Sequence, residues 1–147
     1  FGWYADPIFH ATGDYPEVMR KLVPIRSKKG GFRRSRLPQF TKDEAEYIKG
    51  TYDFLGLNHY TTVLTKDIPE IPIDGKPAVD KDSRTVEWQD SSWPSGASNW
   101  LKVVPWGFTK LLVWLEHRYG NVPIYITENG FSDHDEINDQ GRVNYYK

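Results

Sequence analysis

The sequence predicts an α/β fold built around a parallel unit of β-strand, α-helix and β-strand. Three segments predict this unit: an apolar strand over residues 52–60, a helix that begins near Pro105, and a second strand over residues 124–127. Strands joined by a long crossover that contains a helix lie parallel in one sheet. Ligand-binding side chains of such sheets gather at the carboxyl ends of the strands.

Two helices are expected before the first strand. Pro16 in an early-turn position, followed by the negative charge of Glu17, predicts the opening of a short helix. Residues 41–44, Thr-Lys-Asp-Glu, form a capping box. In this motif the Thr41 hydroxyl accepts from a backbone N–H while the Glu44 carboxylate reaches back to the N-cap. We therefore expect a second helix from there to about Gly50.

A basic stretch surrounds the glycine pair at residues 30 and 31. No nucleic-acid-binding motif and no regular pattern of aromatic residues accompany it, so we interpret it as a solvated loop. A net charge of -1 also argues against a protein built mainly to bind nucleic acid or anionic membranes. The basic residues are Arg20, Lys21, Arg26, Lys28, Lys29, Arg33, Arg34 and Arg36.

The strands and helix of the parallel unit follow from residue type. Residues 54–57, Phe-Leu-Gly-Leu, are too continuously apolar for an exposed antiparallel strand and suit a strand that is buried on both faces. Residues 63 to about 99 are rich in Pro, Asp and Ser without a sustained period, which predicts a long excursion. An apolar stripe after Pro105 predicts a helix, and Gly120, which readily adopts the left-handed backbone conformation, is expected to end it. The stripe consists of Phe108, Leu111, Leu112, Leu115 and Tyr119.

Length and composition restrict the class of protein. A chain of 147 residues is usually one domain, and it has no apolar run long enough to cross a membrane. The absence of Cys excludes disulfides and thiolate chemistry, and the His residues lack metal-ligand spacing. Aromatic residues make up 15% of the chain, with six Trp. Flat aromatic surfaces fill a core or stack on ligands such as sugars.

Residues 124–130, Ile-Tyr-Ile-Thr-Glu-Asn-Gly, bring a carboxylate to the end of a strand. Asn129 and Gly130 favour a turn there, so the Glu128 side chain is expected to face a pocket rather than the core. The parallel unit places Asn58 and Tyr60 in the same neighbourhood. Taken alone, a carboxylate beside a turn is more often structural than functional.

Other aromatic and imidazole side chains have a structural interpretation. His59 alternates to the face opposite Asn58 and Tyr60, so we predict a packed or hydrogen-bonded core histidine. Trp106 and Trp114 lie on the helix after Pro105 and are predicted to serve packing rather than sugar contacts.

Several blocks, in one order along the chain, resemble the glycoside hydrolase family 1 enzymes, the β-glucosidase, lactase-phlorizin hydrolase and myrosinase group, and most closely its animal members. Together the blocks span nearly the whole chain, which makes the resemblance specific. They are residues 2–7 (Gly-Trp-Tyr-Ala-Asp-Pro), 13–16 (Gly-Asp-Tyr-Pro), 37–41 (Leu-Pro-Gln-Phe-Thr), 53–61 (Asp-Phe-Leu-Gly-Leu-Asn-His-Tyr-Thr), Trp100 with 104–108 (Val-Pro-Trp-Gly-Phe), and 125–130 (Tyr-Ile-Thr-Glu-Asn-Gly).

The resemblance implies part of a (β/α)8 barrel, with residues 1–147 as a piece of a single glycosidase domain. The piece corresponds to roughly the sixth and seventh βα units, with a long loop between them. It also implies a retaining β-glycosidase whose nucleophile is Glu128 and whose nucleophile-orienting hydroxyl is that of Tyr60. Asn58 would bind substrate, and Trp100 would line the aglycone side.

The resemblance further implies a β-linked glycoside or oligosaccharide substrate, no cofactor and no metal. It points to a secreted parent protein. The acid/base carboxylate of the family sits in a Thr-x-Asn-Glu-Pro motif on an earlier strand, and that motif is absent here. We therefore expect this segment to be inactive alone and to require the rest of the barrel.

Two alternatives keep the same fold. One is a non-catalytic, klotho-like homologue that binds sugar or protein and has lost catalytic carboxylates. The other is a thioglucosidase of the myrosinase type, which would keep Glu128 as nucleophile while replacing the acid/base residue. The upstream sequence that carries the acid/base position would discriminate among the three.

Overall fold

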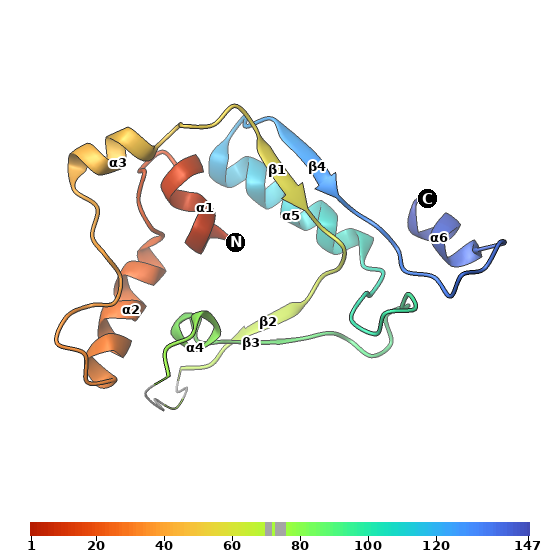
Figure 1. Ribbon diagram of the computed structural model, residues 1–147, viewed down its shortest axis with the longest axis horizontal. Helices are drawn as coiled ribbons and strands as arrows, with labels where there is room; N and C mark the ends of the chain where they lie inside the picture. Colours follow the sequence, from red (N-terminus) through yellow and green to blue (C-terminus); the bar gives the residue numbers. More distant parts are fainter. Residues whose placement is uncertain (70–71, 73–75) are drawn as a thin grey trace. The chain divides into compact units, whose positions relative to one another are not determined.

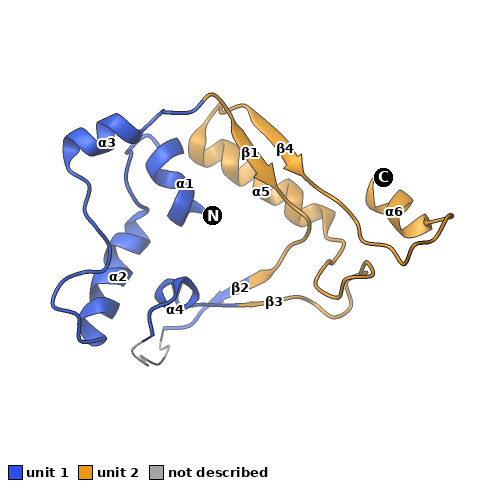
Figure 2. Ribbon diagram, viewed as in Figure 1, with its two compact units in different colours: residues 1–52, 65–86 blue, residues 53–64, 87–147 orange. Residues whose placement is uncertain are grey.

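A computed structural model describes residues 1–69, 72 and 76–147. Three helices open the chain, and strands and further helices follow them (Figure 1); the chain falls into two units (Figure 2). Unit 1 consists of residues 1–52 and 65–86, and unit 2 of residues 53–64 and 87–147. Part of the predicted excursion over 63–99, namely residues 70, 71 and 73–75, lies outside the described residues.

The parallel unit is present in unit 2. Strand β1 (Leu55–Asn58) pairs in parallel with β4 (Ile124–Glu128), and helix α5 (Pro105–Tyr119) lies between them in the sequence. The prediction of a βαβ unit is therefore confirmed. The first strand is shorter than the expected 52–60, because its ladder begins only where the Leu55 N–H donates to Pro123 O at 2.8 Å.

The pairing of β1 with β4 contains one irregularity. Leu57 pairs with Ile126, but the next residue, Asn58, pairs with Glu128, so Thr127 is an extra residue on β4. Such a bulge lets two successive side chains approach the same face of the neighbouring strand. The irregularity lies at the carboxyl ends of both strands, where the sequence places the candidate site.

Strand β1 is buried on one face only in this chain. Leu55 and Leu57 are each 3% exposed, whereas Gly56 and Asn58 between and after them are exposed. The expectation of burial on both faces is thus met on one side, since β4 is the only strand paired with β1 among the described residues. The apolar core of unit 2 consists of Leu55, Leu57, Leu101, Val104, Leu115 and Tyr119.

Helix α5 begins and ends where the sequence predicts. Pro105 occupies its first turn, where the missing N–H is not needed, and Gly120 ends it with a positive φ of 71°. A further short helix, α6 (Gln140–Tyr145), begins at Asp139, whose carboxylate accepts from the Arg142 N–H at 2.9 Å.

Unit 1 is mainly helical. It contains α1 (Gly2–Phe9), α2 (Glu17–Lys29), α3 (Lys42–Ile48) and α4 (Val79–Ser83). The capping box of α3 is confirmed: the Glu44 N–H donates to Thr41 Oγ1 at 3.2 Å, and the Thr41 N–H donates to Glu44 Oε2 at 2.8 Å. Helix α2 continues through Pro24 for 13 residues, so it is longer than the short helix expected.

The predicted excursion over residues 63–99 contains regular structure. Besides α4, it holds β2 (Leu64–Asp67) and β3 (Thr85–Trp88), which form a two-stranded sheet. Local periodicity cannot reveal this sheet, because its strands are four residues each and their partners lie about 20 residues apart.

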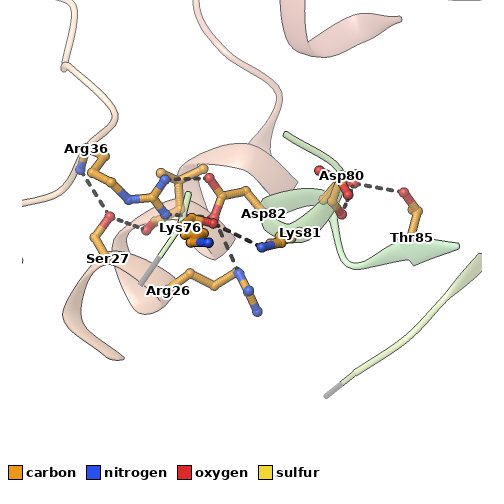
Figure 3. Close-up of polar contacts among 10 residues, drawn as sticks. Arg26, Ser27, Arg36, Lys76, Asp80, Lys81, Asp82 and Thr85 are labelled. Carbon is orange, nitrogen blue, oxygen red and sulfur yellow. Dashed lines mark hydrogen bonds and ion pairs between the residues drawn. The ribbon is translucent and has the colours of Figure 1, made fainter. Parts of the chain in front are cut away.

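The interpretation of the basic stretch as a solvated loop is wrong for two of its members. Figure 3 shows Arg26 on α2 and Arg36 on the following segment turned toward Asp82 of α4. Arg36 donates to both Asp82 carboxylate oxygens at 2.6 and 2.7 Å, and Arg26 Nε lies 3.4 Å from the same carboxylate. The Asp82 and Arg26 side chains are each 10% exposed.

Ser27 completes this buried cluster. Its hydroxyl donates to Val23 O at 2.7 Å and accepts from the Arg36 N–H at 3.1 Å (Figure 3). The hydrogen bonds that Arg36 donates to Asp82 raise the pKa of Arg36 above its already high ordinary value. The basic residues thus serve to hold α2 and α4 together, a non-local role that composition does not reveal.

No helix among the described residues is both long and apolar enough to span a bilayer.

Candidate active site

Glu128 and Tyr60 meet at the carboxyl ends of the two parallel strands. The Tyr60 hydroxyl donates to Glu128 Oε2 at 2.9 Å across 68 positions of sequence. This hydrogen bond to the carboxylate is the largest cause that raises the pKa of Tyr60, and burial and nearby charge act in the same direction. The phenol therefore stays a donor, and Glu128 remains exposed at the open end of the sheet.

Asn58 joins the same face through Thr127. The Thr127 hydroxyl donates to Asn58 Oδ1 at 2.6 Å, so the amide nitrogen of Asn58 is left at the other end of the side chain. The bulge in β4 accounts for this arrangement, since Thr127 and Glu128 follow one another yet both contact side chains from β1 and its continuation. Asn58, Tyr60 and Glu128 thus lie together, as the parallel unit predicts.

Trp100 lies beside Tyr60. Their rings are 6.0 Å apart in an edge-to-face arrangement, and Trp100 is 56% exposed. Gln89 holds this segment in place by donating to Trp100 O at 2.9 Å and to Thr61 Oγ1 at 3.1 Å. All four predicted site residues are therefore grouped within unit 2.

Sequence reasoning missed the role of Asn129 as a bridge. Its amide nitrogen donates to His59 O at 2.7 Å and to the Tyr145 hydroxyl at 2.8 Å. The Tyr145 hydroxyl in turn lies 3.3 Å from Tyr60 O. The sequence signal, Asn-Gly after a strand, was interpreted as a turn, yet neither Asn129 nor Gly130 adopts a positive φ.

His59 is packed, as predicted. Its ring stacks on Phe108 of α5 with centroids 4.4 Å apart, and burial lowers its pKa, partly opposed by a hydrogen bond with its own backbone. It lines a cavity of about 200 Å³ together with Tyr60, Asn129 and Tyr145. The His59 imidazole is therefore a neutral ring that packs between the candidate site and α5.

Two predicted packing residues remain accessible in this chain. Trp106 is 45% exposed and contacts Trp93 edge-to-face with centroids 5.8 Å apart, while Trp114 is 39% exposed and contacts Tyr119 in the same manner at 5.9 Å. Within the described ranges, no group of three His, Asp or Glu side chains is arranged to hold a metal ion.

Comparison with known proteins assigns the chain to a family. A model described as Glycosyl hydrolase family 1 matches residues 1–147. Lactase/phlorizin hydrolase of Rattus norvegicus is 47% identical over 148 residues, which is 99% of this chain and 8% of that protein. Aphid myrosinase has a TM-score of 0.79 at 37% identity, over 99% of this chain and 30% of that chain.

A mutant of a rice β-glucosidase, solved in a covalent complex with Glc, also has a TM-score of 0.79, at 35% identity and with 99% of this chain covered. The chain spans 30% of that structure as well, so it corresponds to a minor part of each relative. Because the family match extends over all 147 residues, this chain belongs to glycosyl hydrolase family 1 and forms an α/β part of its (β/α)8 barrel.

Proposed function

We propose that the protein containing this chain is a retaining β-glycosidase and that Glu128 is its nucleophile. The observation that carries the proposal is the 2.9 Å hydrogen bond from the Tyr60 hydroxyl to Glu128 Oε2 at the carboxyl ends of two parallel strands. Such strand ends are where (β/α)8 enzymes place catalytic groups. A neutral donor on one oxygen orients the carboxylate while the other oxygen stays available for attack.

The chemistry proceeds in two displacements. A Glu128 oxygen attacks the anomeric carbon, the bond to the aglycone oxygen breaks, and a second carboxyl group protonates that oxygen. The same second group then removes a proton from water, which attacks the anomeric carbon and frees Glu128. We propose that this second carboxyl group comes from a strand outside the chain, since retaining enzymes keep the two groups roughly 5 to 5.5 Å apart.

Asn58 and Trp100 are proposed to bind substrate. The hydrogen bond from Thr127 fixes the Asn58 amide with its nitrogen free to donate to a sugar hydroxyl. The exposed ring of Trp100 offers a flat wall beside Tyr60, on which an apolar aglycone can stack. No cofactor is required by this mechanism.

The rest of the barrel is proposed to complete the site. Parallel sheets in α/β proteins are covered on both faces, yet here Tyr125 is 61% and Ile126 43% exposed on β4. Further strands and helices of the same domain would cover these side chains. We place the chain at about the sixth and seventh βα units of that domain.

Covalent trapping of the full-length protein tests the proposal. A 2-deoxy-2-fluoroglycoside slows hydrolysis of the glycosyl ester, so peptide mass spectrometry of the treated enzyme should find the label on Glu128. Glu116→Gln, a change on the exposed side of α5, should be labelled like the wild type, whereas Glu128→Gln should take up no label.

Other outcomes have defined meanings. Label on a different carboxylate would refute the assignment of Glu128. A folded protein that no fluoroglycoside labels would instead be a klotho-like binding homologue. Label on Glu128 combined with turnover of S-glycosides but not O-glycosides would identify a thioglucosidase.

A further inference from the structure

The Asn129 side chain connects three parts of the candidate site. It follows Glu128 directly, its amide nitrogen donates to His59 O at 2.7 Å, and the same nitrogen donates to the Tyr145 hydroxyl at 2.8 Å. That hydroxyl in turn donates a hydrogen bond to Tyr60 O at 3.3 Å. The Asn129 amide therefore binds two consecutive carbonyl groups just after β1: that of His59 directly, and that of Tyr60 through the Tyr145 hydroxyl.

The chemistry of the partners requires an amide at this position. The carbonyl oxygen of His59 only accepts, so the group that faces it must donate. An amide nitrogen has two protons and serves both acceptors, whereas a carboxylate of the same shape would oppose the carbonyl oxygen. The Tyr145 hydroxyl fits between them because it accepts from Asn129 and donates to Tyr60 O.

A turn does not explain the residue. Asn is favoured in turns partly because it tolerates the left-handed backbone region, but Asn129 does not have a positive φ. Its side chain is half-buried and lines the cavity that also contains Tyr145 and Tyr60. The requirement for Asn129 therefore lies in its hydrogen bonds.

These bonds close a ring around the predicted nucleophile. Glu128 is bonded to Tyr60 through side chains at 2.9 Å, and its backbone oxygen accepts from the His59 N–H at 2.9 Å. Asn129, the residue after Glu128, donates to the carbonyl oxygen of His59, the residue before Tyr60. The backbone that carries the donor hydroxyl and the backbone that carries the carboxylate are thus fixed to each other.

We propose that Asn129, with Tyr145, is a positioning residue that keeps the Tyr60 hydroxyl on the Glu128 carboxylate. The inference rests on the proposed function and extends it to residues that do not touch the substrate. Rigid support of this kind decides whether a site holds its reacting groups to within a fraction of an ångström.

A double-mutant cycle in the full-length enzyme tests the inference. The rate of inactivation by a 2-deoxy-2-fluoroglycoside and kcat/KM would be measured for Asn129→Ala, Tyr60→Phe and the double variant. Asn129→Ala should slow inactivation by about 100-fold, the size expected when a reacting group is misplaced by about 1 Å. In the Tyr60→Phe background the same change should slow it by less than about 3-fold, because the hydroxyl to be positioned is gone.

Milder and matched variants complete the design. Tyr145→Phe removes the two hydrogen bonds of the Tyr145 hydroxyl but leaves the bond from Asn129 to His59 O, and it should slow inactivation by about 5-fold, mainly through kcat rather than KM. Asn121→Ala, exposed in the loop after α5, and Tyr47→Phe, which is 84% exposed on α3, should leave the rate unchanged. Tyr145→Phe decides the question if Asn129→Ala fails to fold.

Three results would overturn the inference. Equal losses for Asn129→Ala with and without the Tyr60 hydroxyl would indicate a general structural role. Loss of thermal stability in Tyr145→Phe with an unchanged inactivation rate would indicate the same. A wild-type enzyme that takes no label on Glu128 would remove the proposed function, and this inference with it, before any variant is compared.

Discussion

The two units of the chain place their polar groups in opposite ways. In unit 1 the buried carboxylate of Asp82 is surrounded by the guanidinium groups of Arg26 and Arg36, with side chains 10 to 21% exposed. In unit 2 the carboxylate of Glu128 is exposed at the end of a strand and accepts from the neutral hydroxyl of Tyr60. The Asp82 carboxylate is ion-paired inside unit 1, and the Glu128 carboxylate is held at the surface of unit 2 by a hydrogen bond.

The cores of the two units also differ in polarity: buried polar and charged side chains occur in unit 1, whereas the core of unit 2 is hydrophobic. Among the described residues, the buried hydrophobic side chains of unit 1 are Ala5 and Val23, and its buried polar or charged side chains are Asp6, Ser27 and Asp82. The buried hydrophobic side chains of unit 2 come from β1, from α5 and from the segment just before α5, and Glu128 is not among them because it is exposed. The difference teaches that a buried carboxylate is retained here with charged partners, whereas an exposed carboxylate at a strand end is held by a neutral donor and keeps its other oxygen accessible.

The same chemical change should therefore have opposite effects in the two units, and the larger effect is expected in unit 2. In the full-length protein, Glu128→Gln should lower kcat/KM for an aryl β-glycoside by about 10⁴-fold or more, as removal of a nucleophile does. The thermal unfolding midpoint should stay near that of the wild type, because the exposed carboxylate contributes little to packing. Substantial residual turnover, or a large loss of stability, would break the comparison.

Asp82→Asn should give the reverse pattern. Two guanidinium groups would lose the charge that pairs them, which costs about 3 kcal/mol for a largely buried ion pair. The free energy of unfolding from a urea titration should fall by that amount, while kcat/KM of the folded enzyme stays close to wild type. The matched control is Asp67→Asn, because Asp67 pairs with Arg84 but has a side chain 59% exposed. That exposed pair should be worth about 0.5 kcal/mol.

The smallest effect concerns pH and His59. Burial lowers the pKa of His59 below 6.5, so the folded protein binds a proton there less readily than the unfolded chain. Its contribution to stability is then complete above pH 6.5 and is lost as the pH falls toward the lowered pKa. His59→Phe keeps an aromatic ring against Phe108 and should reduce the loss of unfolding free energy between about pH 7.5 and about pH 5.

The control for this pH dependence is His117→Gln, on the exposed side of α5. It should keep the slope of stability against pH seen in the wild type. An identical slope in His59→Phe would show that the ring is not desolvated in the folded enzyme.

Local signals account for the parts of the fold that the sequence predicted well. The capping box at Thr41 and Glu44, and the limits of α5 at Pro105 and Gly120, depend on residues within one or two turns of the chain. Helix α1 was not predicted, because Pro7 lies inside an eight-residue helix and removes a hydrogen-bond donor there. The cluster around Asp82 was missed because its partners lie 46 and 56 positions away.

In the candidate site, too, local motifs predict some residues, while the role of another depends on long-range contacts. Glu128, Tyr60 and Asn58 follow from strand ends and from family motifs, and the structure brings them together. The sequence predicts only a turn at Asn129. Its hydrogen bond to His59 O spans 70 positions, and no local pattern encodes such a contact. Long-range hydrogen bonds were thus the missing information in both units.

The extra residue in β4 gives the site a tolerance to one particular change in chain length. Because Thr127 is the surplus position opposite Asn58, its removal would restore regular pairing and leave Glu128 opposite Asn58, on the same face of the sheet. The hydrogen bond from the Thr127 hydroxyl to Asn58 Oδ1 would be lost. A single-codon deletion at Thr127 would therefore loosen the Asn58 amide, while Glu128 would keep its strand partner.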